Sequence, residues 1–322
     1  MGDWRIFLAV RLPLACLALA VVLEAGAWAL RDTPPRRHDL DRLVLAIESV
    51  SLSADTVLLG DSVTQDVART YRLLPSGRLA NLTTNQASGL LGAYLLLARY
   101  MERNPAPRHV VVAATPEFFA YDPEGRAAET YLTSVFRRPA ERAAIAEGLG
   151  SLADPGWRPA AFDLERRIVE PSVALAMPSA GGYLEGISDP ASASELETTP
   201  TSDVAMAAIV ARRARVPTLS PSARWTLGRL CALVAPHGTV VHVVRAPVPQ
   251  SVLALRRADG AYAALDGTVV EAMAACPASR IADINEVALF SDHAMRDGDH
   301  LRRPGWSARY ASLLSSYLAA LN

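Results

Sequence analysis

The sequence contains no lysine, because its 32 positively charged side chains are all arginine. No lysine can therefore act as a catalytic base or form a Schiff base with a carbonyl substrate. Basic and acidic residues are almost equal in number, 32 against 33, and the formal net charge is -1. Since binding to nucleic acid requires clustered positive charge, this balance argues against nucleic acid as a partner.

Cysteine is also scarce, with three residues in a chain of 322. Cys16, Cys231 and Cys276 are too few for a disulfide scaffold and lack the spacing of metal ligands. The motifs of zinc proteases and P-loop proteins are missing as well, and the sequence predicts no cofactor and no metal. Cys231 and Cys276 each lie in or beside a predicted helix that precedes a strand. They can pair if the domain is extracytoplasmic, and two buried free thiols are an equal alternative.

Charged residues are almost missing between Ile6 and Leu30, where only Arg11 and Glu24 interrupt an apolar run. The length suits a membrane-spanning helix, which needs about 20 apolar residues. A cleaved signal peptide is the alternative, because Ala25-Gly26-Ala27 fits a cleavage site. The run continues to Leu30, which favours an uncleaved anchor over residues 1–31. A short N-terminus remains most simply in the cytoplasm, so we expect a single-pass protein of the inner or plasma membrane with its main domain in the periplasm or outside the cell.

The rest of the chain is predicted to be a linker over residues 32–45 and one α/β domain over 46–322. Short apolar runs alternate with helical patterns, which indicates a mostly parallel sheet covered on both sides. The stretch from about Tyr121 to Pro221 breaks this rhythm and is interpreted as an insertion over the sheet, with helices at Ala140–Leu149 and Ala205–Arg213. Elsewhere we expect strands at Thr56–Leu59, His109–Ala114, Thr239–Val244 and Arg280–Ile284, and helices at Leu90–Arg103, Ala223–Ala235, Val269–Ala275 and Trp306–Leu321.

Gly60-Asp61-Ser62 directly follows the first predicted strand. Ligands of open α/β sheets bind beyond the carboxyl ends of the strands. A serine there, at the start of the next helix, benefits from the helix dipole and from free backbone N–H groups, which can also stabilise an oxyanion. Ser62 is therefore a candidate nucleophile, with a simple helix N-cap as the alternative. Asp61 is expected to hold the turn.

A serine hydroxyl needs a base at neutral pH, and a histidine near the C-terminus can supply it. Asp297-Gly298-Asp299-His300 precedes the last predicted helix. On a loop at the carboxyl edge, His300 can reach Ser62, and Asp297 can hold the other ring nitrogen. Asp292-His293 is a rival pair that lacks this spacing. His109 and His242 are expected to be structural. Glu117, at a strand end, is expected to be a solvated carboxylate, with a contact to substrate as the alternative.

Gly60-Asp61-Ser62 and Asp297-x-x-His300 resemble the first and last motif blocks of the SGNH/GDSL hydrolase superfamily. The resemblance spans roughly Thr56 to Leu321, with the insertion unmatched. It implies a three-layer α/β/α sandwich with a mostly parallel sheet, of the SGNH/flavodoxin-like kind, and a catalytic triad formed by Ser62, His300 and Asp297. Members of the superfamily include esterases, lipases and carbohydrate O-acyltransferases.

The middle motif blocks of that superfamily are altered in this chain. The third block carries Gly-x-Asn-Asp after a strand, whereas this chain has Ala113-Ala114-Thr115-Pro116-Glu117 at that place. The usual side-chain donor of the oxyanion hole is therefore missing or replaced, and Asn85 or Thr115 is a candidate to join Ser62 in that role. This divergence resembles membrane-tethered bacterial members that acylate envelope polymers, such as alginate O-acetyltransferases and the D-alanyl transfer protein of teichoic acid synthesis.

The resemblance and the anchor together predict an O-acetyltransferase that acts on an extracellular or cell-envelope polysaccharide through an acyl-enzyme on Ser62. Acetyl-CoA is cytoplasmic, so a membrane-bound O-acyltransferase is the implied partner that delivers the acyl group. One alternative is a carboxylesterase or deacetylase of the same fold. The other is a catalytically inactive SGNH-like module that binds a glycan or a partner protein, which the missing asparagine motif favours.

Overall fold

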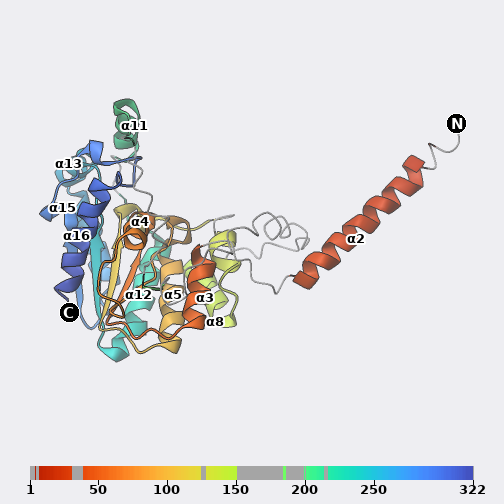
Figure 1. The fold of residues 1–322 in the computed structure, drawn as a ribbon, viewed down its shortest axis with the longest axis horizontal. Helices are drawn as coiled ribbons and strands as arrows, with labels where there is room; N and C mark the ends of the chain where they lie inside the picture. The colour runs from red at the N-terminus through yellow and green to blue at the C-terminus, as the bar shows by residue number, and fades with distance from the viewer. Residues whose placement is uncertain are drawn as a thin grey trace.

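The computed structural model describes residues 4, 7–30, 39–124, 128–150, 184–185, 199, 201–213 and 217–321 (Figure 1). The strands are β1 (Thr56–Gly60), β2 (Leu79–Asn81), β3 (His109–Ala114), β4 (Val240–Arg245) and β5 (Ser279–Asp283). The longer helices are α2 (Leu12–Leu30), α3 (Asp39–Ser49), α4 (Ser62–Thr70), α5 (Gly89–Arg103), α8 (Pro139–Gly148), α11 (Asp203–Arg213), α12 (Pro221–Val234), α13 (Gln250–Ala258), α14 (Ala261–Ala272) and α16 (Gly305–Ala319). Shorter helical segments are η1 (Phe7–Arg11), η2 (Gln86–Ser88), α6 (Pro116–Ala120), η3 (Glu129–Thr133), η6 (Ala235–His237), α15 (Ile284–Val287) and η7 (Asp292–Ala294).

The five strands form one parallel sheet in the order β2-β1-β3-β4-β5. The strands β1, β3 and β4 are runs of mainly Val, Leu and Ala that are buried almost throughout, which is typical of a parallel sheet with both faces covered. From β1 the chain passes to β2 on one side and then returns to β3 on the other. The strand order therefore reverses between β1 and β3, and ligands bind at the carboxyl ends of strands at such a point.

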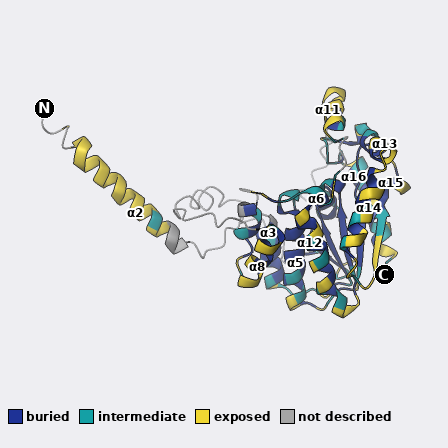
Figure 2. Cartoon of the chain, turned by 180° about the vertical axis from the view of Figure 1, so that it is seen from behind, coloured by how far each residue is buried: buried dark blue, intermediate teal, exposed yellow. Residues whose placement is uncertain are grey.

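The two faces of the sheet pack against different helices. Val57 and Leu59 of β1 belong to one core cluster with residues of α3, α5, α8 and α12, whereas Leu58 packs with residues of α4 and α16. This alternation follows from the two-residue period of side chains along a strand. In Figure 1, α16 lies on one side of the sheet and α3, α5 and α12 lie on the other, and Figure 2 shows the buried strands between them.

The predicted strands correspond to β1, β3, β4 and β5, and each end differs by one residue at most. The predicted helices correspond to α5, α8, α11, α12 and α16, with ends that shift by one or two residues. The helix expected at Val269–Ala275 is α14, which begins earlier, at Ala261, and ends at Ala272. The short strand β2 and the helix α13 were not predicted.

The domain begins earlier than the sequence predicts. Residues 32–45 are expected to form a linker, but α3 begins at Asp39, and its residues Leu40, Leu43 and Ile47 are fully buried. The spacing of three and four residues places them on one helix face, which packs against α5. The linker prediction is therefore wrong from Asp39 onward. Residues 31–38 lie outside the described residues.

The predicted insertion, residues 121–221, is described only in part. Residues 125–127, 151–183, 186–198, 200 and 214–216 of it lie outside the described residues. The described pieces belong to the domain core: Phe136 and Ile145 of the region around α8 join the cluster of α5 and α12, and Ile209 of α11 joins the cluster of α16. The insertion therefore contributes to the core.

Cys231 of α12 and Cys276 form a disulfide, with their Cα atoms 4.4 Å apart. The bond ties α12 to the segment that precedes β5. Of the two alternatives for this pair, the structure has the disulfide, which is the form that persists in oxidising compartments.

An apolar helix formed by η1 and α2 occupies the N-terminus. Within the described part of the chain, Phe7–Gly26 is the helical stretch that is long and apolar enough to cross a membrane, and it is not buried against the domain. Figure 2 shows the exposed surface of α2. The sequence-predicted anchor segment is thus an apolar helix, a property it would share with a signal sequence.

Candidate active site

Gly60 and Asp61 form a tight turn between β1 and α4. A Cβ atom at position 60 would lie 2.1 Å from the carbonyl oxygen of Ala113 on β3, so only glycine permits this approach of the two strands. Asp61 is the N-cap of α4, and its Oδ1 accepts the N–H groups of Val63 (3.1 Å) and Thr64 (3.3 Å). These groups lack partners within the helix, so the carboxylate fixes the start of α4.

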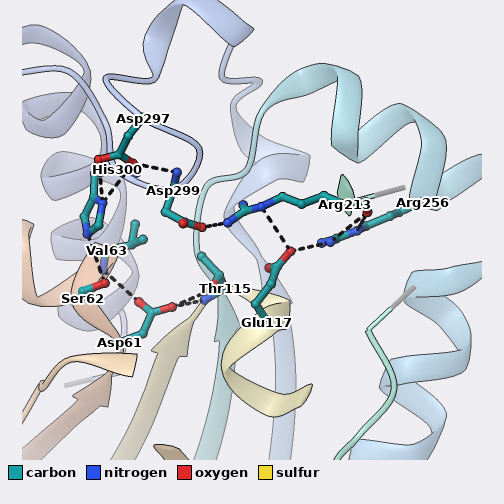
Figure 3. A network of polar contacts seen from close by, with 10 residues as sticks. All are labelled: Asp61, Ser62, Val63, Thr115, Glu117, Arg213, Arg256, Asp297, Asp299 and His300. Atoms are coloured by element: carbon teal, nitrogen blue, oxygen red, sulfur yellow. Dashed lines mark hydrogen bonds and ion pairs between the residues drawn. The ribbon is translucent and has the colours of Figure 1, made fainter. Parts of the chain in front are cut away.

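Ser62, the first residue of α4, faces His300. The Oγ atom of Ser62 lies 3.1 Å from Nε2 of His300, and Nδ1 of the same ring lies 3.1 Å from both carboxylate oxygens of Asp297 (Figure 3). Because a carboxylate only accepts hydrogen bonds, Nδ1 carries the proton and Nε2 is free to accept the serine hydroxyl. The three predicted triad residues are thus brought together at the distances that an activated serine requires.

Asp297 also shapes the loop that carries His300. Its Oδ1 accepts the backbone N–H groups of Asp299 (2.9 Å) and His300 (2.7 Å), and an antiparallel bridge between Met295 and Leu301 closes the loop. Burial acts to raise the pKa of Asp297, but the hydrogen bonds from the side chain and backbone of His300 outweigh it and hold the pKa below its ordinary value. Asp297 is therefore ionised at neutral pH, as the partner of an imidazolium must be.

Thr115 occupies the place of the missing asparagine motif, directly after β3. Its backbone N–H and its hydroxyl both donate to Oδ2 of Asp61, at 2.8 and 2.6 Å. Burial raises the pKa of Asp61 above its ordinary value, and the bonds from Thr115 and Thr64 offset part of that effect. Since both Thr115 donors are engaged, the structure does not support the expectation that Thr115 donates to an oxyanion.

The other two residues expected at the oxyanion hole are Ser62 and Asn85. The backbone N–H of Ser62 is the first of α4 and is not used by the Asp61 cap, which binds the next two. The side-chain oxygen of Asn85 accepts the N–H of Ala87 at 3.0 Å, which leaves its amide nitrogen as a donor. Its neighbour Thr84 donates its backbone N–H to the Gly60 carbonyl at 3.0 Å, so Asn85 lies at the edge that carries Ser62.

An ion-pair network lies beside the triad (Figure 3). Arg213, the last residue of α11, pairs with Asp299, and its Nε lies 3.9 Å from Oε1 of Glu117. Arg256 of α13 is fully buried and pairs with the same Glu117 oxygen. Arg256 also donates to the backbone carbonyl of Arg213 through Nη2 and Nε, at 3.2 and 3.3 Å. Sequence reasoning missed this network, for which the position of Glu117 just after a strand was a weak signal.

The expectation that Glu117 is solvated is wrong. Its side chain is only 19% exposed. Burial acts to raise the pKa of Glu117, but the charges of Arg256 and Arg213 and the hydrogen bond from Arg256 outweigh it and lower the pKa. The carboxylate of Asp299 points toward Arg213 and not toward the His300 ring (Figure 3).

The other titratable candidates do not contact the triad. Asp292 accepts the backbone N–H of Ser251 at 3.0 Å and also its hydroxyl, and the neighbouring His293 is exposed. His109 and His242 pair with each other, Nδ1 to Nε2, at 3.2 Å. His109 begins β3, so this pair lies toward the opposite edge of the sheet from Ser62.

A scan against protein-family models finds no match, and no curated protein matches the sequence significantly. Among the described residues, no group of three or more His, Cys, Asp and Glu side chains is arranged to hold a metal ion.

Proposed function

We propose that the chain is a serine acyl-transfer enzyme of the SGNH type, with Ser62 as nucleophile, His300 as general base and Asp297 as the group that orients His300. The observation that carries this proposal is the continuous hydrogen-bonded series from Ser62 Oγ through the imidazole to the Asp297 carboxylate. A helix N-cap alone would not place a correctly oriented histidine on the serine hydroxyl, since Asp61 already provides the cap.

In the proposed reaction, Nε2 of His300 takes the hydroxyl proton while Ser62 Oγ attacks the acyl carbon of an ester. The carbonyl oxygen becomes an oxyanion, for which the backbone N–H of Ser62 and the amide of Asn85 are the proposed donors. The leaving alkoxide takes the proton from His300, and an acyl-serine remains. A hydroxyl of the acceptor then gives its proton to His300 and bonds to the acyl carbon. The bond to Ser62 Oγ breaks, and Oγ takes the proton back from His300.

The fold supports the assignment to the SGNH superfamily. The strand order β2-β1-β3-β4-β5 is that of flavodoxin-like folds, and helices pack on both faces of the sheet. This arrangement supports the three-layer α/β/α sandwich that the resemblance of the Gly60-Asp61-Ser62 and Asp297-x-x-His300 motifs implies.

Within this class, we propose transfer of acetyl groups to an extracellular or cell-envelope polysaccharide. The apolar N-terminal helix supports attachment to the inner or plasma membrane, and the Cys231–Cys276 disulfide supports an oxidising compartment, either periplasmic or extracellular. A membrane-bound O-acyltransferase is the proposed partner, because the acyl donor originates in the cytoplasm.

Hydrolysis is the second candidate function, and the exposure of the triad favours it. The side chains of His300 and Asp297 are 23% and 51% exposed, so water can reach the site as the structure stands. A carboxylesterase or deacetylase uses the same acyl-serine, and only the attacking group differs. The intact geometry of the triad argues against the alternative of an inactive binding module.

The products of one incubation distinguish transfer from hydrolysis. The full-length protein in detergent is given an activated acetyl ester with and without an acceptor oligosaccharide, and mass spectrometry follows free acetate and acetylated sugar. We expect the acceptor to divert acetyl groups into the sugar at the expense of acetate. Acetate release that the acceptor does not change would support the esterase, and Ser62→Ala must abolish either reaction.

A further inference from the structure

Helix α11 lies directly against the loop that carries Asp297 and His300. A Cβ atom at Gly298, in the middle of this loop, would lie 3.1 Å from the side chain of Ile209, so helix and loop are in close contact. Thr201, just before α11, donates its backbone N–H to the carbonyl of Met295 at 3.0 Å. Packing and a backbone hydrogen bond thus tie the start and middle of α11 to the loop.

The end of α11 is tied to the same loop by charge. Arg213 pairs with Asp299, which is adjacent to His300 and donates its own backbone N–H to Asp297. The Arg213 side chain is only 11% exposed, and Arg256 and Glu117 hold its backbone carbonyl and its guanidinium. A largely buried arginine that is held at both its guanidinium and its backbone carbonyl fixes the position of its partner far better than an exposed lysine or arginine does.

The segment after β3 connects this anchor to the nucleophile. Thr115 binds Asp61, the cap residue beside Ser62, and two residues later Glu117 binds Arg213 and Arg256. One short segment of chain therefore contacts both the turn that carries the serine and the arginine that holds the histidine loop. Figure 3 shows this path, which runs from Asp61 through Thr115 and Glu117 to Arg213 and Asp299.

We infer that Arg213 is a positioning residue of the acyl-transfer reaction: through Asp299 it fixes the loop that presents His300 to Ser62, with α11 as the clamp on that loop. The inference rests on the proposed function of Ser62. Arg213 touches neither Ser62 nor His300 in the described contacts, so its effect reaches the reaction through the placement of the base. Loss of this placement lowers turnover while substrate binding is retained, because small displacements of a catalytic group are costly in rate.

The test measures kcat and KM for an activated acetyl ester with the full-length protein in detergent. The variants are Arg213→Gln, Asp299→Asn, the double variant and Arg213→Lys. The matched control is the pair Arg245 and Asp266, because the Arg245 side chain is also 11% exposed and neither residue contacts the loop in the described structure. Its variants, Arg245→Gln and Asp266→Asn, remove an ion pair of similar burial, and Arg245→Gln also removes the contact of Arg245 with Asp283 at 3.4 Å.

We expect Arg213→Gln and Asp299→Asn each to lower kcat roughly 10-fold or more, with KM within about twofold. The double variant falls no further than the worse single one, because both remove the same contact. Arg213→Lys recovers part of the loss, and the control variants stay within about twofold of wild type. An Arg213→Gln variant as active as the control variants, or losses that multiply in the double variant, would overturn the inference.

Hydrogen–deuterium exchange tests the clamp independently of activity. We expect Arg213→Gln, but not Arg245→Gln, to accelerate exchange in peptides that cover residues 295–302 while α16 stays protected. Unchanged exchange in that loop would overturn the inference even if the variant lost activity. A wild-type protein without any Ser62-dependent turnover would instead refute the proposed function, and the exchange data would still decide whether Arg213 fixes the loop.

Discussion

Both hydrogen-bond donors of Thr115 point to a single oxygen of Asp61, at 2.8 Å from the backbone nitrogen and 2.6 Å from the hydroxyl. The superfamily that the motifs resemble places an asparagine-containing motif at this point of the chain. Here the same point joins β3 to the turn before Ser62. Thr115 is therefore engaged in holding Asp61, and the proposed oxyanion donors are the backbone N–H of Ser62 and the amide of Asn85.

Removal of the Thr115 hydroxyl is predicted to destabilise the domain. Thr115→Val keeps the shape of the side chain but leaves the buried Asp61 carboxylate with one donor fewer, and a hydrogen bond to a charged group contributes about 1.5–3 kcal/mol. Thr115→Ser retains the hydroxyl and should lose less. Chemical denaturation of both variants measures the difference, and equal losses would show that the hydroxyl does not support Asp61.

The two aspartates of the histidine loop are predicted to differ strongly in their effect on activity. Asp297→Asn should lower kcat on the order of 10³-fold or more, because a neutral amide does not stabilise the imidazolium that forms on His300. Asp299→Asn should lower it roughly 10-fold, since Asp299 acts only through Arg213. Steady-state kinetics of the two folded variants provide the comparison, and a larger loss in Asp299→Asn would mean that the wrong carboxylate is paired with His300.

Reduction of the Cys231–Cys276 bond is predicted to lower stability. The bond closes a loop of 45 residues, for which the chain-entropy model gives about 4 kcal/mol. Cys276→Ala should lose nearly as much as reduction does, and a reductant should have no further effect on that variant. Thermal unfolding with and without reductant measures both, and an unchanged midpoint on reduction of the wild-type protein would contradict the prediction.

The buried His242 is predicted to make stability depend on pH. Its Nδ1 lies 3.0 Å from the Tyr317 hydroxyl, and burial, followed by the charges of His109 and Arg280, lowers the pKa of His242 from 6.5 to about 4. Between pH 4 and pH 6.5 the unfolded state binds more protons than the folded state. The contribution of His242 to stability is therefore fully present above pH 6.5 and falls as the pH drops toward 4. The expected loss from His242 is on the order of 3 kcal/mol.

His242→Gln tests this dependence, because glutamine does not titrate and can still bind Tyr317. Denaturant unfolding at pH 7.5 and pH 4.5 gives, for the wild type and for the variant, the change in the free energy of unfolding between the two pH values. The variant should lose clearly less stability than the wild type over that interval. Equal losses would show that other groups produce the acid sensitivity.

The sheet was predictable where strands are fully buried. Runs such as Thr56–Gly60 and His109–Ala114 consist almost entirely of apolar residues that favour a buried strand, so their composition predicts strands. The strand β2 has only three residues, and α13 carries Arg256 and Arg257 in its last turn. Neither segment therefore shows a clear apolar pattern in the sequence. The helix α3 was mistaken for a linker because charged residues and two prolines precede and interrupt its apolar spacing.

The arrangement of Ser62, His300 and Asp297 was predictable because the proposed chemistry requires particular residue types at the ends of particular elements. Ser62 follows the first strand and His300 precedes the last helix, so the topology alone brings them to one edge. The Arg213 network was not predictable, because Arg213 meets Asp299 across 86 positions, and Arg256 meets Glu117 across 139. Only tertiary packing selects these partners among 32 arginines.

The most direct test of the central claim is to trap the acyl-enzyme. The full-length wild-type protein and the Ser62→Ala variant are incubated with an activated acetyl ester, quenched in acid and digested, and the peptide that contains Gly60-Asp61-Ser62 is analysed by mass spectrometry. The account predicts that the wild-type peptide gains the mass of one acetyl group on Ser62 and that the folded variant gains none. Acetylation at another residue, or ester turnover by Ser62→Ala equal to that of the wild type, would contradict it.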